Sequence, residues 1–454
     1  MDSGNLKILM LGWEFPPQIT GGLGTACEGL ARALSKRDVK IHFLMPRLIG
    51  DEEAPYMHLV DVEKNYAPAL ERVLRQVNGT HRVHTTGGDS IPLSLYEIPS
   101  VLGPYLRPLG DPLAGHADLP KLASTLFDER VIEFGALPND DLLAAPAKQL
   151  YGDRLFAEVL LFAKRVLAVS AELNFDLIHA HDWMTYPAAI ALGRRTGKPV
   201  ILHVHSLESD RSGNHRNFTI EGIESAALRE ATAVIAVSEY TRRRAVADYG
   251  LSSEKTFVAH NGLVARDRIA KPQRKDENYR VLFMGRVTFQ KGPDYFVEAA
   301  LEVLKILPNV RFILAGSGDM LDRLRQRIQR AGAEKSFDLP GFLRGSQVDE
   351  TLAGADLYVM PSVSEPFGIS ALEAIYYDVP VLVSRQSGVS EVIQHALKAD
   401  FWDIHELADL MIGALRYPEL REDLLGMARE ELKKLNWDAT AMRVRDVYRV
   451  IAGR

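Results

Sequence analysis

The sequence predicts an α/β protein made of two successive halves. Short runs rich in Val, Ile and Leu alternate with longer amphipathic stretches over most of the 454 residues, a pattern typical of parallel strands covered by helices. Residues 265–279 are polar and highly charged, and they divide the alternation into two series. The length also favours two domains over one. We therefore expect a domain over residues 1–264, a linker over 265–279 and a second domain over 280–435.

Apolar runs predict six strands in the first half, and helical apolar spacing over residues 23–34 predicts a helix after the first of them. The expected strands span 7–11, 39–45, 176–180, 200–205, 233–237 and 256–259. Residues 50–151 are interrupted by many glycines and prolines. We interpret that stretch as an elaboration of the first domain.

The second half repeats the alternation more regularly. Strands are expected at 280–284, 310–315, 336–339, 357–360 and 379–383, and helices at 294–306, 320–331, 368–376 and 389–396. Residues 437–451 place Arg and apolar side chains at helical spacing. A helix that amphipathic must pack on another element, so residues 436–454 are expected to form a C-terminal helix that packs on the rest of the protein.

Composition excludes several classes of protein. With 54 Lys plus Arg against 60 Asp plus Glu, the net charge is -6, which gives no overall attraction to nucleic acid. No stretch approaches the roughly 20 apolar residues of a transmembrane helix, so any membrane contact would be peripheral. Cys27 is the only cysteine, so neither an intramolecular disulfide nor a cysteine-based zinc site is expected. A cytoplasmic location fits this composition.

Two joined α/β halves imply a cleft between them, and ligands of parallel sheets bind beyond the carboxyl ends of the strands. Gly22, Leu23 and Gly24 follow the first strand and open the helix over 23–34. Glycines there allow close approach of the backbone, and helix N-terminal N–H groups attract anions. The spacing lacks the third glycine of the dinucleotide fingerprint. An ordinary strand-to-helix turn is the alternative.

A pair of cations follows the first strand of the second half. Gly285 and Arg286 come directly after that strand, and Lys291 and Gly292 follow closely. Two cations in a glycine-bounded loop suit a diphosphate. The alternative is a solvated cationic loop.

Two carboxylates, Glu365 and Glu373, flank the start of another expected helix. Between them lie Pro366, Phe367, Gly368 and Ile369. Glu365 could bind sugar hydroxyls and Glu373 a ribose diol, while the N–H groups of Phe367 and Gly368 could bind phosphate. Glutamates at helix starts can also serve only the helix dipole.

Histidines form a further group. His179 and His181 lie two apart on one strand, with Asp182 after it, and His203 and His205 end the next strand. Each pair shares one side of its strand and could point into the cleft. A metal site is conceivable, but packed or hydrogen-bonded histidines are the commoner case, and we expect no metal. His205, at the strand end, is the better candidate for a reaction centre.

At these residues the chain resembles the retaining nucleotide-sugar glycosyltransferases of family 4, which have the GT-B fold of two Rossmann-like domains facing each other across a nucleotide-sugar cleft. The resemblance extends over the second half and the core of the first. Its most specific parts are Gly285-Arg286 with Lys291-Gly292, and Ser364-Glu365-Pro366-Phe367-Gly368 with Glu373. Supporting parts are Gly21-Gly22-Leu23-Gly24, His181-Asp182-Trp183, His205-Ser206-Leu207, Asn261-Gly262 and Gly316-Ser317-Gly318-Asp319.

The resemblance implies a role for each motif. Arg286 and Lys291 would hold the donor diphosphate, Glu365 and His205 would contact the transferred sugar, and Glu373 would contact the ribose. The glycine turn at 22–24 would close over the phosphates, and the last helix would return to the first domain. The remaining substrate-binding positions would be His181, Asp182, Asn261, Gly285, Gly316, Pro366, Phe367, Gly368 and Ile369. The family usually needs no metal or other cofactor.

Within the family the chain is similar to glycogen and starch synthases at His181-Asp182-Trp183, and to sucrose and sucrose-phosphate synthases at His205-Ser206-Leu207. Ile19 stands where bacterial-type glycogen synthases carry lysine. The implied reaction moves a hexose, with glucose the first choice, from a UDP-, ADP- or GDP-sugar to a carbohydrate or small polar acceptor with retention. The alternatives are a sucrose-phosphate or other small-acceptor synthase, a nucleotide-sugar epimerase or phosphorylase, and a non-catalytic sugar-nucleotide sensor.

Overall fold

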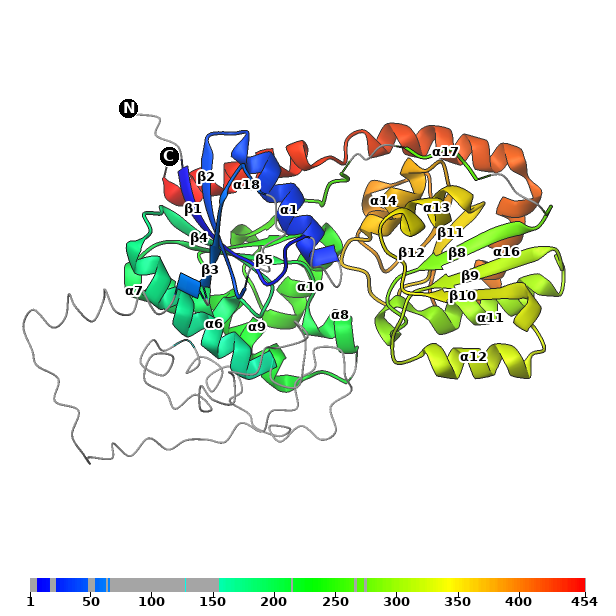
Figure 1. Ribbon diagram of the computed structural model, residues 1–454, viewed down its shortest axis with the longest axis horizontal. Helices are drawn as coiled ribbons and strands as arrows, with labels where there is room; N and C mark the ends of the chain where they lie inside the picture. Colours follow the sequence, from blue (N-terminus) through cyan, green and yellow to red (C-terminus); the bar gives the residue numbers. More distant parts are fainter. Residues whose placement is uncertain are drawn as a thin grey trace, which may run out of the picture.

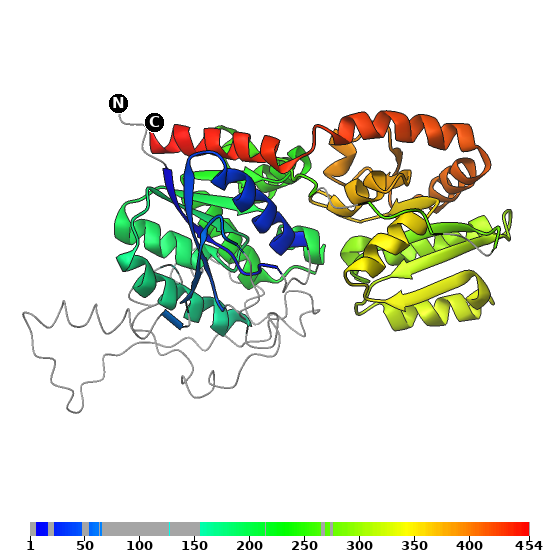
Figure 2. The same ribbon diagram turned by 45° about the horizontal axis from the view of Figure 1, so that its top comes forward.

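The computed structural model contains two parallel sheets, each covered by helices on both faces (Figures 1 and 2). It describes residues 6–16, 22–47, 54–62, 64–65, 127, 155–213, 215–264, 268–272 and 276–453. The α/β prediction is confirmed. Gly21, Ile19 and most of the expected elaboration at 50–151 lie outside the described residues.

The first sheet has seven strands in the order β3-β2-β1-β4-β5-β6-β7, and it forms what we call the first domain together with the helices that cover it. Its strands are β1 (Leu6–Leu11), β2 (Val39–Met45), β3 (His58–Asp61), β4 (Leu177–His181), β5 (Val200–Val204), β6 (Ala233–Ala236) and β7 (Thr256–Val258). Its helices are α1 (Gly22–Ser35), α6 (Leu155–Val169), α7 (Tyr186–Thr196), α8 (Glu208–Ser212), α9 (Phe218–Glu230), α10 (Glu239–Tyr249) and α18 (Trp437–Ala452). All strand pairs are parallel.

The first sheet is buried on both faces, which is why its strands appear in the sequence as uninterrupted apolar runs. Alternation along β1 sends Leu9 and Leu11 into one core and Ile8 and Met10 into the other. The second of these cores also holds Cys27 of α1 and Tyr448 of α18. We call that side the α1/α18 face.

The second sheet has six strands in the order β10-β9-β8-β11-β12-β13, and with its covering helices it forms the second domain. Its strands are β8 (Tyr279–Met284), β9 (Val310–Ala315), β10 (Phe337–Gly341), β11 (Leu357–Met360), β12 (Val381–Ser384) and β13 (Leu397–Ala399). Its helices are α11 (Pro293–Leu304), α12 (Leu321–Arg330), α13 (Ser346–Gly354), α14 (Ile369–Tyr376), α15 (Val389–Val392), α16 (Ile404–Arg416) and α17 (Pro418–Leu432). The strand order reverses between β1 and β4 in the first sheet and between β8 and β11 in the second. At such a reversal the carboxyl ends of the two strands are open to ligands.

One expected helix is wrong. Residues 389–396 were expected to be a single helix, but α15 ends at Val392 and the edge strand β13 begins at Leu397. Glu391 of α15 accepts hydrogen bonds from the first domain. The strand that follows, β13, has only three residues, too few to give a recognisable pattern in the sequence. The other expected strands agree with the structure to within two residues.

The chain crosses between the domains twice, and the two crossings run side by side. Leu263 N–H donates to the Leu435 carbonyl over 3.0 Å, and Leu263 also forms a parallel bridge with Asn436. Gly262 packs so tightly on this second crossing that an added Cβ would lie 2.3 Å from Trp437 N. After it, α18 runs back along the first domain and packs on α1 (Figure 1). Among the described residues, none of the helices has both the length and the apolar character needed to cross a bilayer.

The contact between α1 and α18 supplies a stability test. A Cβ on Gly29 of α1 would lie 2.3 Å from the Trp437 ring, so Gly29→Ala should push the helices apart and lower the free energy of unfolding by about 1–3 kcal/mol. The control is Gly426→Ala in α17, where a Cβ meets nothing within 4 Å and should stabilise by up to about 1 kcal/mol. Urea unfolding measures both. Equal effects of the two substitutions would contradict this packing.

Candidate functional site

The loop after β8 presents Arg286 on a buried support. Arg286 Nη2 donates to Gln290 Oε1 over 2.9 Å, and Gln290 is buried. The backbone carbonyl of Gln290 accepts the N–H of Val363 at 3.0 Å. The loop that carries the cation is therefore tied to the loop that follows β11.

Lys291 and Glu365 form an ion pair across these two loops. Lys291 Nζ lies 2.5 Å from Glu365 Oε2, and the Ser362 hydroxyl donates to the same oxygen at 3.3 Å. The Glu365 residue is only 6% exposed, and a buried carboxylate requires such partners. The structure thus brings together two of the residues that the sequence analysis singled out from separate motifs.

Two glycines make this arrangement possible. A Cβ on Gly316, after β9, would lie 1.8 Å from the Gly285 carbonyl oxygen, so the loops after β8 and β9 meet only because this residue has no side chain. Gly368 has φ +106° and precedes α14, a backbone conformation that favours glycine. The chain turns there, and the first N–H groups of α14, from Ile369 onward, have no acceptor within the helix.

Glu373 lies on α14 near the same end of the sheet as Glu365. Both carboxylates act on Tyr358 of β11: burial raises the pKa of this phenol, and the charges of Glu365 and Glu373 raise it further. The Tyr358 hydroxyl donates to the Met284 carbonyl at the end of β8 over 3.2 Å. Arg286, Lys291 and both glutamates therefore lie around the carboxyl ends of β8 and β11.

On the first domain, Asp182 holds the loop that carries His205. Asp182 Oδ1 accepts the N–H of His205 at 2.7 Å and that of Ser206 at 3.3 Å. Asp182 itself has φ +60°, a left-handed conformation that is uncommon for a residue with a side chain. Burial raises the pKa of Asp182 to about 7, although Arg211 and the His205 N–H act in the opposite direction.

The four histidines form a ladder on the α1/α18 face of the first sheet. His179 Nδ1 lies 2.6 Å from Tyr448 Oη and His179 Nε2 lies 3.2 Å from His203 Nδ1. His181 Nδ1 lies 2.9 Å from His205 Nε2. His179, His181 and His203 are buried beneath the helices, which agrees with the alternative of packed, hydrogen-bonded histidines. Their alternation in β4 and β5 is as expected, but that face is covered by α1 and α18, and only His205 is partly exposed.

Burial determines the charge of this ladder. It lowers the pKa of His205 to about 3, and it lowers the pKa values of His179, His181 and His203, with further lowering from neighbouring imidazoles. At neutral pH all four imidazoles are uncharged.

The segment next to Glu365 is bound by the first domain, through partners that sequence reasoning missed. The Ser364 hydroxyl donates to Asp210 Oδ1 over 2.6 Å and accepts from Arg244 Nη1 at 3.0 Å. The Pro366 carbonyl accepts the hydroxyls of Ser238, at 2.6 Å, and Thr241, at 3.1 Å. No sequence signal could have found these partners, because the contacts exist only once the domains are packed together.

A second contact between the domains is made by Glu391. Its carboxylate accepts the N–H groups of Glu239 and Tyr240 at the start of α10, at 2.7 and 3.0 Å, and lies 2.7 Å from His260 Nε2. Burial alone would raise its pKa, but these hydrogen bonds lower the pKa of Glu391 below its ordinary value. The second domain thus supplies the anionic cap of a helix in the first.

Four further predicted positions belong to the first domain. Gly22, Leu23 and Gly24 form the first turn of α1. Asn261 is buried beside the domain crossing, and its Oδ1 has no hydrogen-bond partner within the described residues.

Three family models match successive parts of the chain. The starch synthase catalytic domain matches residues 7–133, Glycosyltransferase Family 4 matches residues 122–265, and Glycosyl transferases group 1 matches residues 265–431. The glycogen synthase of Mycobacterium tuberculosis is 23% identical over 98% of this chain and 94% of its own.

Solved structures agree with the fold. Sucrose-phosphate synthase from Thermosynechococcus elongatus superposes with a TM-score of 0.70 at 17% identity, covering 99% of both chains. Anabaena HepE in complex with UDP-glucose superposes with a TM-score of 0.59 at 17% identity, covering 99% of this chain and 100% of its own. Successive parts of the chain therefore match models of glycosyltransferases, and the solved structures share its two-domain GT-B fold. The chain is similar in type to glycogen synthase, starch synthase and sucrose-phosphate synthase.

The histidine ladder predicts acid sensitivity. The unfolded chain takes up protons at imidazoles near pH 6.5 and the folded chain does not, so stability falls as pH decreases below that value. One buried imidazole accounts for about 1.4 kcal/mol per pH unit. His203→Gln should therefore lessen the fall in unfolding free energy between pH 6 and pH 5 by about 1 kcal/mol, as measured by urea unfolding.

The control for this test is His405→Gln, at an exposed position, which should leave the pH dependence unchanged. Asp182, with its pKa raised to about 7, acts in the opposite direction, because its stability contribution is lost as pH rises. The wild-type chain, His203→Gln and His405→Gln all retain Asp182, so its effect cancels when their pH dependences are compared. An unaltered pH dependence in His203→Gln would contradict the buried, neutral state of the ladder.

Proposed function

We propose that this chain is a retaining hexosyltransferase that moves glucose from a nucleoside diphosphate to an acceptor hydroxyl. The observation that carries the proposal is the Lys291–Glu365 ion pair, with Nζ and Oε2 2.5 Å apart, beside Arg286 and the start of α14. A cation paired with a sugar-binding carboxylate can take a diphosphate as its partner when the donor binds. The UDP-glucose complex of the similar HepE structure supports a nucleotide-sugar donor.

The proposed chemistry is the stabilisation of a departing diphosphate. Arg286, oriented by buried Gln290, and Lys291 provide positive charge, and the first N–H groups of α14 with those of Phe367 and Gly368 provide hydrogen-bond donors. Gly285 and Gly316 leave room for the phosphates, while Glu373 binds the ribose. The transfer needs no metal or other cofactor, since these groups supply the charge.

On the sugar side, Glu365 and His205 contact the transferred hexose from opposite domains. Burial keeps the His205 imidazole neutral, so it can hydrogen-bond a sugar hydroxyl. In the reaction the bond between the anomeric carbon and the diphosphate oxygen breaks, and the acceptor oxygen bonds to that carbon on the same face. The acceptor proton passes to the departing diphosphate. His181, Asp182, Asn261, Pro366, Ile369 and the turn at Gly22, Leu23 and Gly24 complete the proposed substrate contacts.

The proposed acceptor is a glucan, as for the glycogen synthase relative, and a sugar phosphate is the second candidate because of the similarity to sucrose-phosphate synthase. A reaction on nucleotide sugars and a single buried cysteine suit the cytoplasm.

Substitution of Arg286 tests the site. Arg286→Ala should lower kcat about a hundredfold or more, because one preorganised donor to the leaving group is lost, and should leave the urea unfolding curve unchanged. The matched control is Arg325→Ala on α12, whose side chain is 60% exposed and should have normal turnover. Near-normal turnover of Arg286→Ala would refute the role.

Donor and acceptor are tested together with the purified full chain. UDP-, ADP- and GDP-glucose are each supplied with and without glycogen, glucose, glucose 6-phosphate and fructose 6-phosphate, and nucleotide release is measured. Release that requires one donor and increases with one acceptor is expected, and NMR should show that the anomeric configuration of the product is that of the donor. Donor binding without acceptor-dependent release would favour a sensor, and an altered donor sugar without transfer would favour an epimerase.

A further inference from the structure

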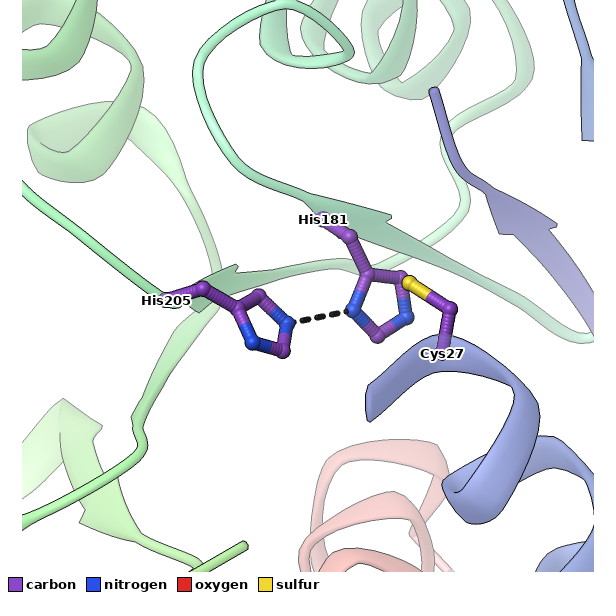
Figure 3. Close-up of side chains that lie close together, drawn as sticks. All are labelled: Cys27, His181 and His205. Carbon is purple, nitrogen blue, oxygen red and sulfur yellow. Dashed lines mark hydrogen bonds between the residues drawn. The ribbon is translucent and has the colours of Figure 1, made fainter. Parts of the chain in front are cut away.

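Three side chains on the α1/α18 face bring metal-ligating atoms together. Cys27 comes from α1, His181 from the end of β4 and His205 from the residue after β5 (Figure 3). One ligand atom from each lies within 4.8 Å of the others. In Figure 3 the Cys27 sulfur lies by the side of the His181 ring away from His205.

These atoms match the preferences of zinc. Zinc binds thiolate sulfur at about 2.3 Å and imidazole nitrogen at about 2.0–2.1 Å in tetrahedral geometry, which places ligand atoms about 3.5 Å apart. His181 Nδ1 and His205 Nε2 are 2.9 Å apart and hydrogen-bonded, so an ion between them would replace that bond. The Cys27 sulfur would have to turn toward the same side of the His181 ring.

Packing and hydrogen bonding do not account for every atom of this cluster. His181 Nδ1 has His205 as its partner, but His181 Nε2 is buried and has no hydrogen-bond partner in the described part of the chain. Cys27 is fully buried and is not in a disulfide. An ion that takes His181 Nδ1 beside His205 does not satisfy this nitrogen, so the case for the site rests on the three ligand atoms that lie within 4.8 Å of one another.

We propose that Cys27, His181 and His205 form a binding site for a divalent transition metal of the zinc type. The Cys27 thiol gives its proton to solvent on binding, and water takes the fourth position from the side of His205, the partly exposed member. The site was not expected from sequence, because a single cysteine builds no zinc site alone and its two histidine partners lie far along the chain.

The metal would inhibit the transferase. This consequence rests on the proposed function, in which His205 contacts the transferred sugar. An ion bound to His205 occupies the imidazole nitrogen and stands in the way of the donor. The metal site thus shares His205 with the proposed transfer reaction, for which we propose no metal.

Cobalt absorption tests the site independently of activity. The full chain, freed of metal with EDTA and kept reduced, is titrated with Co²⁺. We expect a sulfur-to-cobalt charge-transfer band and the intense visible bands of tetrahedral Co²⁺, saturating at one ion per chain and abolished by one equivalent of Zn²⁺ but not by Mg²⁺. Cys27→Ser should lose the charge-transfer band, and Cys27→Ala provides a second variant if the serine perturbs the fold.

The matched control is His58→Gln. His58 Nδ1 lies 3.1 Å from His42 Nδ1 in an exposed pair that could bind metal adventitiously, and its removal should leave the charge-transfer band unchanged. Absence of that band in the wild-type chain, or its persistence in folded Cys27→Ser and Cys27→Ala, would overturn the proposal. Circular dichroism and urea unfolding confirm that the variants are folded.

Inhibition is the second readout. With the donor and acceptor found for the wild-type enzyme, Zn²⁺ should inhibit competitively with donor, and Cys27→Ser should require at least tenfold more Zn²⁺ while keeping wild-type turnover in its absence. Equal inhibition of both proteins would overturn the inhibitory role. If no transferase activity is found, the proposed function fails, and the cobalt spectrum still decides the metal site.

Discussion

The hydrogen bonds that hold residues 364–366 against the first domain are the constraint on which the candidate site depends. Ser364 and Pro366 are bound by side chains of the first domain, whereas Glu365 between them is bound by Lys291 of the second. Three successive residues thus contact both halves of the molecule. The position of the Glu365 carboxylate is consequently a property of the domain arrangement as well as of the loop that carries it.

Much of the fold could be predicted because both sheets are parallel and covered on each face. Strands such as β2, β9 and β11 are short apolar runs with clear ends, and the observed bounds equal the expected ones. The prediction failed where an element is too short to give a pattern in the sequence, or where its end is set by a contact with another part of the fold. The edge strand β13 has three residues, and α15 carries the Glu391 side chain that caps a helix of the other domain.

The candidate site was predictable in part for a similar reason. Residues after the carboxyl ends of strands can be located from sequence, and this brought Arg286, Lys291 and Glu365 into one group. Their supports could not be found, since Gln290, Asp210 and Arg244 act through contacts that only the folded chain creates. For the histidines, alternation correctly paired residues on one side of each strand, but the helices that cover that side come from the two ends of the chain.

The paired crossing between the domains limits how the two domains can move relative to each other. One flexible connection would allow the second domain to rotate about any axis. Two connections that are hydrogen-bonded at Leu263 and Leu435, with Gly262 packed on Trp437, resist torsion and leave bending about a single axis. Separation of the domains would therefore be confined to bending at these two crossings, and it would break the hydrogen bonds that Ser364 and Pro366 make to the first domain.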